Sequence, residues 1–380
     1  QIKHTILKIL FLIGSLSNSG GMERMLTFQA NYFADHFEYD VTVLTYDQKN
    51  SQDFFTLSDK VNRIRIPVEK KSHPNRFFNL YLLKKYLESL KSEIEKTLLQ
   101  SHFDICLSFG IEGKFLYQIK DKSKKIIEFH FSKDFYKQDS GSFLQKVWRR
   151  YRFKQSIGKT KMYDRMVVLT ETDKDFWQQY LSNVVAINNP NVMQSEANSS
   201  LENKVAVSLG RLTRQKGFDR LIDIWEKVAE KYPDWELHIY GEGAEKKKLM
   251  ELISDKNLQE FVQINPPVKD VAKVYQSASL YLMASRFEGF GLVLIEAMSF
   301  GLPVIAYNVI GPNELVQNNV NGFLIEDGNS DEFAYQIGLL CSDYEKRKEL
   351  GENAKEFVEK FSPQQIMKQW SDLFNDVLRR

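Results

Sequence analysis

The feature that most constrains the fold is an alternation of short β-branched runs with segments of helical spacing, which runs along the chain in two series. The first series opens with a strand at residues 6–13 and a helix at 23–37. The second restarts with a strand at 205–209, after a polar segment at 188–203. Such alternation is typical of βαβ units, in which helices cover a parallel sheet. The sequence therefore predicts an α/β protein with two doubly wound, Rossmann-like domains.

The length of the chain agrees with two domains, because 380 residues exceed the usual size of a single core. We expect an N-terminal domain over residues 1–187, a linker at 188–203 and a C-terminal domain over 204–361. Residues 362–380 carry apolar side chains at helical spacing, and we expect this helix to pack back on the N-terminal domain. Ligands bind at the carboxyl ends of strands in such sheets, so functional residues are sought just after strands.

The charge balance and the cysteines exclude several classes of protein. A formal net charge of +2 lacks the basic excess of nucleic-acid-binding proteins, so no nucleic-acid partner is expected. Cys106 and Cys341 are too few for a disulfide framework and lie among apolar residues, which favours a reducing cytoplasm. The apolar runs at 9–14 and 289–310 are too short or too interrupted to span a membrane.

One segment of the chain has a local excess of positive charge. Residues 143–165 contain eight Lys or Arg and a single acid, with aromatic and aliphatic residues interleaved. The pattern indicates a surface that docks on anionic lipid at the inner face of the plasma membrane, through anchors at Trp148, Tyr151 and Phe153. The alternative is a solvated basic helix with buried aromatic residues.

Two turns with the chemistry of an anion site separate predicted strands from helices. Gly20 and Gly21 precede the first helix, whose initial N–H groups are free to receive an anion, although paired glycines at such a turn are often purely structural. Arg211 and Lys216 follow the strand at 205–209 and suit a diphosphate, because Arg offers a planar fork and Lys a point charge. A solvated charged loop is the alternative at the second turn.

The most specific stretch is residues 285–297, where two acids flank a glycine-containing turn. Glu288 falls in the predicted loop and Glu296 in the following helix, among apolar residues where an unpaired carboxylate would be costly. Both carboxylates can accept hydrogen bonds from sugar hydroxyls. The backbone at the predicted helix start can receive a phosphate, which points to Phe290, Gly291, Leu292 and Val293 as further ligand-binding residues.

Taken in order along the chain, these motifs resemble the retaining glycosyltransferases of family 4, which share the GT-B fold. The resemblance rests on Gly20-Gly21-x-Glu23, Gly210-Arg211, Lys216-Gly217, Gly241-x-Gly243, the spacing of Glu288 and Glu296, and Gly301-Leu302-Pro303-Val304. It implies an acceptor-binding N-terminal domain and a C-terminal domain that binds a nucleotide sugar. One departure is Asn265-Pro266-Pro267, where relatives carry a glycine turn near the base.

The resemblance also implies roles for individual residues. Arg211 and Lys216 would bind the donor diphosphate, and Glu296 the ribose hydroxyls. Glu288 would hold the hydroxyls of the transferred sugar, while Gly20 and Gly21 would lie against the donor. His130, which follows the predicted strand at 126–129, matches the family's histidine near the reacting sugar, so Glu288 and His130 are the catalytic candidates.

No cofactor and no metal are expected, because members of this family work without an obligatory metal. Asp173-Lys174-Asp175 spells the acidic triplet of metal-dependent transferases, but it stands at a predicted helix start, where acids are common. The other histidines show no spacing of metal ligands.

The expected reaction moves a hexose or N-acetylhexosamine from a UDP-sugar or related donor to a hydroxyl of a glycan or lipid-linked glycan, in the synthesis of bacterial lipopolysaccharide, O-antigen or capsule. The leaving diphosphate would be stabilised electrostatically, and the anomeric configuration retained. Two alternatives are another GT-B-like enzyme, such as a sugar-nucleotide epimerase, and a non-catalytic accessory subunit. An assay for epimerised nucleotide without acceptor separates the first, and loss of the donor residues would mark the second.

Overall fold

The computed structural model describes residues 6–18, 20–48, 51–69, 71, 74–130, 143–193 and 197–380, apart from the side chains of residues 76, 77, 111, 143–150 and 152. The described chain divides into two compact units. The N-terminal unit comprises residues 6–130, 143–187 and 366–380, and the C-terminal unit comprises residues 188–365. Each unit is built on its own parallel sheet.

The N-terminal unit holds a seven-stranded sheet in the order β3-β2-β1-β4-β5-β6-β7. The strands are β1 Lys8–Ile13, β2 Asp40–Thr45, β3 Asn62–Arg65, β4 Ile105–Ser108, β5 Lys124–Phe129, β6 Arg165–Val168 and β7 Val184–Ala186. All six pairings are parallel. The order reverses between β1 and β4, as in doubly wound sheets.

Helices cover both faces of this sheet, because the apolar side chains of its central strands alternate between them. Leu10 and Leu12 of β1 pack in one cluster with α2. Phe11 lies between them in sequence and contacts Phe33 of α1, with ring centroids 6.4 Å apart. The helices of this unit are α1 Gly21–His36, α2 Arg76–Gln100, α4 Phe143–Thr160, α5 Glu171–Gln178, α13 Pro363–Arg379 and the short η1 Ile111–Lys114 and η2 Leu116–Gln118.

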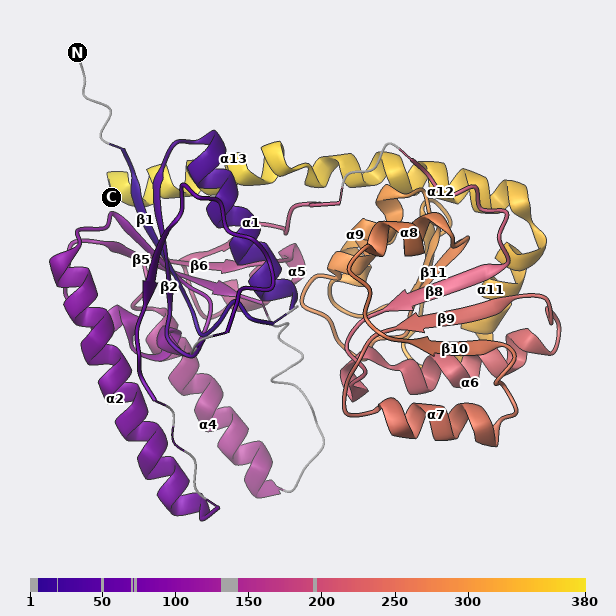
Figure 1. Cartoon of the computed structure of the whole chain (residues 1–380), viewed down its shortest axis with the longest axis horizontal. Coiled ribbons are helices and arrows are strands. Elements are labelled where there is room, and N and C mark those ends of the chain that lie inside the picture. The colour runs from indigo at the N-terminus through magenta and orange to yellow at the C-terminus, as the bar shows by residue number, and fades with distance from the viewer. Residues whose placement is uncertain are drawn as a thin grey trace. The chain divides into compact units, whose positions relative to one another are not determined.

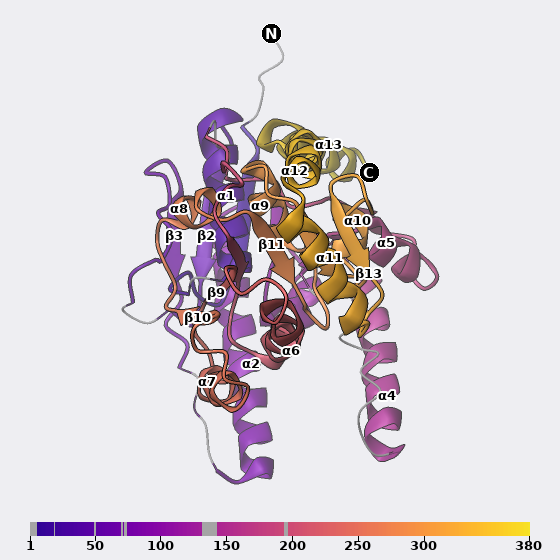
Figure 2. The ribbon, with the colours of Figure 1, turned by 90° about the vertical axis from the view of Figure 1, so that its right-hand side faces the viewer.

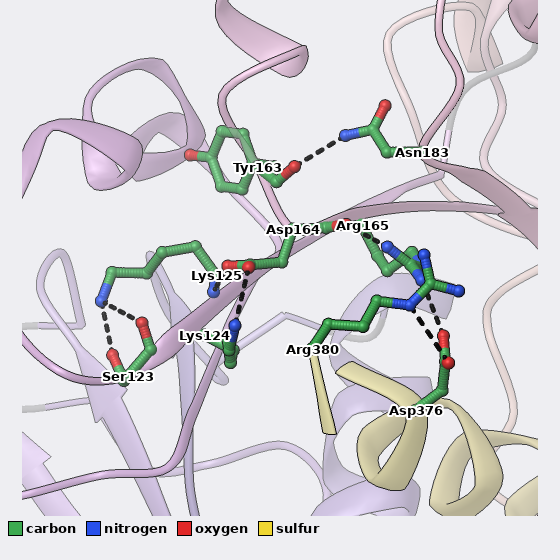
Figure 3. Close-up of polar contacts among 9 residues, drawn as sticks. All are labelled: Ser123, Lys124, Lys125, Tyr163, Asp164, Arg165, Asn183, Asp376 and Arg380. Atoms are coloured by element: carbon green, nitrogen blue, oxygen red, sulfur yellow. Dashed lines mark hydrogen bonds and ion pairs between the residues drawn. The ribbon is translucent and has the colours of Figure 1, made fainter. Parts of the chain in front are cut away.

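The helix α13 belongs to the N-terminal unit from residue 366 onward, although the C-terminal unit, residues 188–365, precedes this part of the chain. Its apolar face packs on α1, where the rings of Phe33 and Phe374 lie 5.2 Å apart. Figure 3 shows the polar attachment: Asp376 accepts hydrogen bonds from Arg165 at 2.6 Å and from Arg380 at 3.2 Å. Asp164, next to Arg165, accepts one from the backbone N–H of Lys125 at 2.7 Å, so the anchoring strand β6 is itself tied to β5.

The helix α4 changes the reading of the basic segment 143–165. Phe153, predicted to be a membrane anchor, packs on Trp177 of α5 with ring centroids 5.5 Å apart, so this part of the prediction is wrong. Tyr163 is buried and donates a hydrogen bond to the carbonyl of Gly113. Tyr151 is 58% exposed, whereas the side chain of Trp148 lies outside the described residues. Of the three predicted anchors, Tyr151 is therefore the one whose side chain is both described and exposed.

The C-terminal unit holds a six-stranded parallel sheet in the order β10-β9-β8-β11-β12-β13. The strands are β8 Val205–Leu209, β9 Glu236–Tyr240, β10 Val262–Asn265, β11 Leu280–Met283, β12 Val304–Tyr307 and β13 Gly322–Ile325. Within this unit α6 and α7 lie on one face of the sheet and α8 and α9 on the other (Figure 1). The helix α11 packs beside α6 (Figure 2).

The helices of the C-terminal unit are α6 Phe218–Ala229, α7 Lys246–Asp255, α8 Val271–Gln276, α9 Leu292–Ser299, α10 Pro312–Leu315, α11 Ser330–Ser342, α12 Tyr344–Val358, and the short η3 Arg214–Lys216 and η4 Glu359–Phe361. The central helix α6 shows why they form: it buries Phe218, Leu221, Ile222 and Trp225 at helical spacing. Together with the strands they build one continuous core.

The segment 188–203, expected to be a linker, is packed into the C-terminal unit over its described part. The amide of Asn191 donates a hydrogen bond to Ser299 at 2.6 Å, and the backbone N–H of Ser199 donates to the carbonyl of Phe300. Leu201 is buried. Among the residues that the structure describes, no helix combines the length and apolar character needed to cross a bilayer.

Candidate active site

The reversal of strand order in the C-terminal sheet determines where a ligand can bind. β8 and β11 are neighbours, but β9 and β10 continue the sheet beyond β8, while β12 and β13 continue it beyond β11. The loops at the carboxyl ends of two such strands diverge, and open α/β sheets bind ligands between them. Here these loops are residues 210–217 and 284–291, which contain five of the residues predicted from the sequence: Arg211, Lys216, Glu288, Phe290 and Gly291.

The two loops approach each other closely because Gly217 has no side chain. Its φ is 66°, a left-handed value that favours glycine, and a Cβ at this position would lie 2.0 Å from the carbonyl oxygen of Ala284. Gly217 is also the N-cap residue of α6. The preceding residue, Lys216, lays its aliphatic chain over Gly210, 3.3 Å from where a Cβ of that residue would stand. The glycines therefore bring the Lys216 ammonium to the second loop.

At this approach Lys216 forms an ion pair with Glu288. Its Nζ lies 2.7 Å from Oε1 of Glu288, and the side chains are 17% and 7% exposed. The hydroxyl of Ser285 donates a second hydrogen bond, at 2.6 Å, to the same carboxylate oxygen. The structure thus joins two residues that are 72 positions apart in the sequence. A sheltered cation whose charge is balanced by one carboxylate stands at the strand-order reversal.

Further contacts between the loops hold this pair in place. Arg286 donates from both terminal nitrogens to Asp219, at 2.8 and 2.6 Å. Burial acts to raise the pKa of Asp219, but the hydrogen bonds and the charge of Arg286, together with backbone hydrogen bonds, outweigh it, and the pKa is lowered overall. The amide of Gln215 donates to the carbonyl of Phe287 at 3.0 Å. These three hydrogen bonds between the second loop and residues 215–219 therefore position the Lys216–Glu288 pair before any ligand binds.

The second loop ends at a helix start without a side-chain cap. Gly291 precedes α9 with a φ of 97°, and no side chain caps the first N–H groups of this helix. Phe290 and Gly291 are buried, while Leu292 and Val293 are partly exposed. Uncapped N–H groups at a helix start attract anions. The predicted phosphate-binding residues 290–293 thus have the backbone arrangement that such a role requires.

Glu296 lies one turn further along α9 and is 3% exposed. Its Oε2 accepts a hydrogen bond from the hydroxyl of Tyr275 at 3.0 Å. Burial, helped by the charges of Glu296 and Glu288, raises the pKa of Tyr281. Arg211, by contrast, is exposed, and its guanidinium makes no side-chain contact with the described residues. The C-terminal unit therefore brings Lys216 and Glu288 together and leaves the Arg211 cation in solvent.

The remaining predicted residues belong to the N-terminal unit. Gly20 precedes α1 and Gly21 is its first residue; no side chain caps this helix either, and Ser19 lies outside the described residues. His130 follows β5, with its imidazole stacked on Phe109 at a centroid distance of 5.4 Å. Its Nε2 lies 3.2 Å from Oε1 of the buried Glu128.

The acidic triplet Asp173-Lys174-Asp175 has the structural role expected from the sequence. The hydroxyl of Thr170 accepts a hydrogen bond from the backbone N–H of Asp173 at 3.1 Å and thereby caps α5. Among the described residues, no group of three His, Cys, Asp or Glu side chains is arranged to hold a metal ion. At the divergent position near β10, the side-chain nitrogen of Asn265 is buried without a hydrogen-bond partner.

Sequence reasoning did not find the partners that position these side chains. Ser285 stands three residues before Glu288, a spacing at which a hydroxyl often meets a nearby group, so this contact left a signal. Arg286 and Asp219 are joined across 67 positions, and Tyr275 meets Glu296 from another helix. Glu128 lies inside a strand, where it looked like an ordinary polar position. Apart from the contact of Ser285 with Glu288, these pairings are not visible without the fold.

Comparison with known proteins agrees with this architecture. The sequence profile of the family described as "Glycosyl transferases group 1" matches residues 192–357. An uncharacterized glycosyltransferase of Haemophilus influenzae is 31% identical over 370 residues, covering 96% of this chain and 99% of that protein. The amylovoran biosynthesis glycosyltransferase AmsD of Erwinia amylovora is 28% identical over 384 residues, covering 97% and 99%.

Among solved structures, the Staphylococcus aureus protein TarM, crystallised with fondaparinux, α-GlcNAc-glycerol and UDP, superposes with a TM-score of 0.79. It covers 97% of this chain and 100% of the other at 20% identity, a likeness that concerns the fold. The two parallel-sheet domains of this chain are those of a GT-B enzyme. This chain therefore belongs to the group 1 glycosyl transferases and is a glycosyltransferase with the GT-B fold.

Proposed function

We propose that the enzyme transfers a hexose or N-acetylhexosamine from a UDP-sugar to a hydroxyl of a glycan or lipid-linked glycan, with retention of anomeric configuration. The observation that carries the proposal is the ion pair of Lys216 and Glu288 at the strand-order reversal of the C-terminal sheet. A cation and a carboxylate side by side suit the two halves of a sugar nucleotide. The ammonium attracts the diphosphate, and the carboxylate accepts hydrogen bonds from sugar hydroxyls.

Three groups of the C-terminal unit would balance the negative charge of the diphosphate. Arg211 is exposed and free to turn toward a ligand. Lys216 is already held in place, and the uncapped start of α9 offers N–H groups from residues 291–293. As the sugar leaves, negative charge develops on the diphosphate, and preorganised donors stabilise it without reorganisation. An oxygen of the departing diphosphate would assist deprotonation of the acceptor hydroxyl, so that no protein nucleophile is required.

The sugar and ribose would be recognised by carboxylates. Glu296 is buried and accepts a hydrogen bond from Tyr275, an arrangement that would hold it in place for a ribose hydroxyl pair. When the donor binds, the Glu288 carboxylate would accept a hydrogen bond from a hydroxyl of the transferred sugar in place of the one from Lys216. Gly20, Gly21 and His130 of the N-terminal unit are assigned to the donor by their match to the family pattern. No cofactor or metal enters this scheme.

The place of the reaction in bacterial surface polysaccharide synthesis is supported by relatives. AmsD is named for amylovoran biosynthesis, and TarM was crystallised with UDP and an α-GlcNAc compound. We infer an acceptor of the same class, a growing glycan or its lipid-linked precursor. Docking on anionic lipid at the cytoplasmic face of the membrane, through α4, would bring the enzyme to such an acceptor.

A donor panel tests the proposal. Purified enzyme is incubated with UDP-, GDP- and ADP-linked sugars, without acceptor, and the slow release of free sugar and nucleotide is measured alongside thermal shift. We expect one UDP-sugar to stabilise the protein and to be hydrolysed with release of UDP. Formation of an epimerised sugar nucleotide instead of free sugar would favour the epimerase alternative, and the absence of both binding and hydrolysis across the panel would contradict the proposal.

A further inference from the structure

The N-terminal unit contains a buried carboxyl group, that of Glu128, for which the described residues provide no lysine or arginine partner. Glu128, on β5, is 4% exposed, and its Oε1 has no hydrogen-bond partner. Its Oε2 is 3.5 Å from the amide nitrogen of Gln29, a long contact from α1. A carboxyl group in such surroundings is costly to ionise and costly to leave unpaired. Its presence in the core therefore calls for a function.

The imidazole of His130 lies next to the unpaired oxygen. Oε1 of Glu128 lies 3.2 Å from Nε2 of His130, and this nitrogen also lacks a hydrogen-bond partner. The two side chains are 1% and 10% exposed. They stand two residues apart at the end of β5, so both project from the same face of the strand. Two buried polar atoms without hydrogen-bond partners therefore lie close to each other.

The other elements around Glu128 contribute no further charge among the described residues. The helix α1 contributes the uncharged Gln29, the neighbour of Glu128 across β6 is Val167, and Phe109 covers the imidazole. Burial raises the pKa of Glu128 to about 8, against a small opposing effect of Gln29, and burial lowers the pKa of His130 to about 4. At neutral pH the pair therefore holds one carboxylic acid and one neutral imidazole.

We propose that Glu128 is a positioning residue, which in its protonated form donates a hydrogen bond from Oε1 to Nε2 of His130 and so fixes the imidazole as the Nδ1–H tautomer. The proton on the neutral imidazole must then sit on Nδ1, because Nε2 is occupied as an acceptor. His130 is thereby set to donate, not to accept, at its second nitrogen. The expected effect on turnover rests on the proposed function, in which His130 lies beside the transferred sugar. The proposed tautomer of His130 does not depend on that function.

Nitrogen NMR reads the tautomer directly and without substrate. The six histidines are labelled with 15N in the ring, and the signal of His130 is identified by its loss in His130→Asn. We expect the wild type at pH 7 to show an Nδ1–H tautomer for His130. Glu128→Leu should convert it to a mixture of tautomers, and Glu128→Gln, whose amide can still donate to Nε2, should keep it. The same tautomer in wild type and Glu128→Leu would overturn the proposal.

Kinetics then separate positioning from packing. Glu128→Leu should lower kcat by about tenfold or more while donor KM changes by less than about threefold, because an orienting carboxyl acts through the imidazole. Glu128→Gln should restore most of kcat. Wild-type kcat should fall as pH rises through about 8, where Glu128 ionises, and this fall should be absent in Glu128→Gln. If kcat is unchanged in Glu128→Leu although the tautomer changes, the role of His130 in the proposed function fails, and the positioning by Glu128 stands.

Thermal unfolding provides the structural control. Glu128→Leu removes a carboxyl group that is costly to bury, and it also removes the hydrogen bond that we propose to Nε2 of His130. These two effects oppose each other, so we expect Glu128→Leu to change Tm little. The matched control is Glu112→Gln, since Glu112 is equally buried but accepts hydrogen bonds from Ser108 and from the N–H groups of Phe109 and Gly110. It should lower Tm and leave the His130 tautomer unchanged; a loss of Tm in Glu128→Leu as large as in this control would overturn the proposal.

Discussion

Removing the charge of Lys216 should weaken the binding of UDP, and removing that of its partner Glu288 should strengthen it. Lys216→Met is the appropriate change, because Met keeps the aliphatic chain that lies over Gly210 and deletes the ammonium alone. A hydrogen bond to a charged group contributes about 1.5–3 kcal/mol. If the diphosphate takes this bond from Lys216, the Kd for UDP should rise by roughly 10- to 150-fold.

Glu288→Gln tests the other half of the reasoning. In the unliganded enzyme the carboxylate holds Lys216 at 2.7 Å and would repel an incoming diphosphate. Gln keeps the shape of the side chain and can still accept the hydrogen bond from Ser285. We expect the Kd for UDP to fall by about fivefold, equivalent to about 1 kcal/mol, while kcat falls because the sugar loses its carboxylate. Tighter product binding together with slower turnover is not expected of a residue with a packing role.

Isothermal titration with UDP measures both variants, and the double variant closes the cycle. Lys216→Met alone should also lower Tm, because it leaves Glu288 buried without its cation, and the double variant should recover part of this loss. Lys227→Met is the control: this lysine of the same unit pairs with Asp331 on the outside of α6, and its loss should leave the Kd unchanged. An unchanged Kd in Lys216→Met, or weaker UDP binding in Glu288→Gln, would refute the reasoning.

The remaining predictions concern the loops, the metal and the membrane. Gly217→Ala should destabilise the protein by about 1–3 kcal/mol or more, because it combines a left-handed φ with a clash against Ala284. Gly158→Ala in α4, where a Cβ meets nothing, should be stabilising by roughly 0.5–1 kcal/mol. Chemical denaturation compares the two variants, and equal effects would contradict the loop geometry. Turnover should persist in EDTA, and complete loss with rescue by manganese would show that the acidic residues were misjudged. Flotation with anionic liposomes should be reduced in a Tyr151→Ser, Lys154→Gln variant and weakened by salt, and equal flotation of variant and wild type would end the membrane role of α4.

The strands of the C-terminal sheet were predictable because each is a short segment with apolar residues that ends at a turn. The prediction for β8, at residues 205–209, coincides with the strand in the structure. The edge strand β3 was missed because its residues, Asn62–Arg65, are mostly exposed and polar, so no burial pattern marks them. Edge strands pair on one side only and carry little sequence signal. The helix α2 was missed as well, since its first turns carry exposed apolar residues such as Phe78 and Tyr81 that blur its helical spacing.

The candidate site was predictable to the extent that its residues follow strands. Lys216 and Glu288 were both named from that position, but their pairing depends on which strands become neighbours, and a single sequence does not give strand order. The partner of His130 was hidden for a different reason. Glu128 alternates with apolar residues in β5 as a solvent-facing side chain would, and only the packing of α1 over that face buries it. The burial of an acidic residue inside a strand therefore becomes apparent only once the covering helix is known.

The position of α13 has a consequence for the synthesis of the protein. The anchors Arg165 and Asp376, 2.6 Å apart in the folded N-terminal unit, leave the ribosome 211 residues apart. At roughly 5–20 residues per second, the first of them waits for tens of seconds before its partner emerges. During that interval the face of α1 that contacts Phe374 has no cover, while the continuous C-terminal unit can already fold. Nascent chains stalled short of α13 should therefore recruit chaperones to the N-terminal unit and leave the C-terminal unit resistant to proteases.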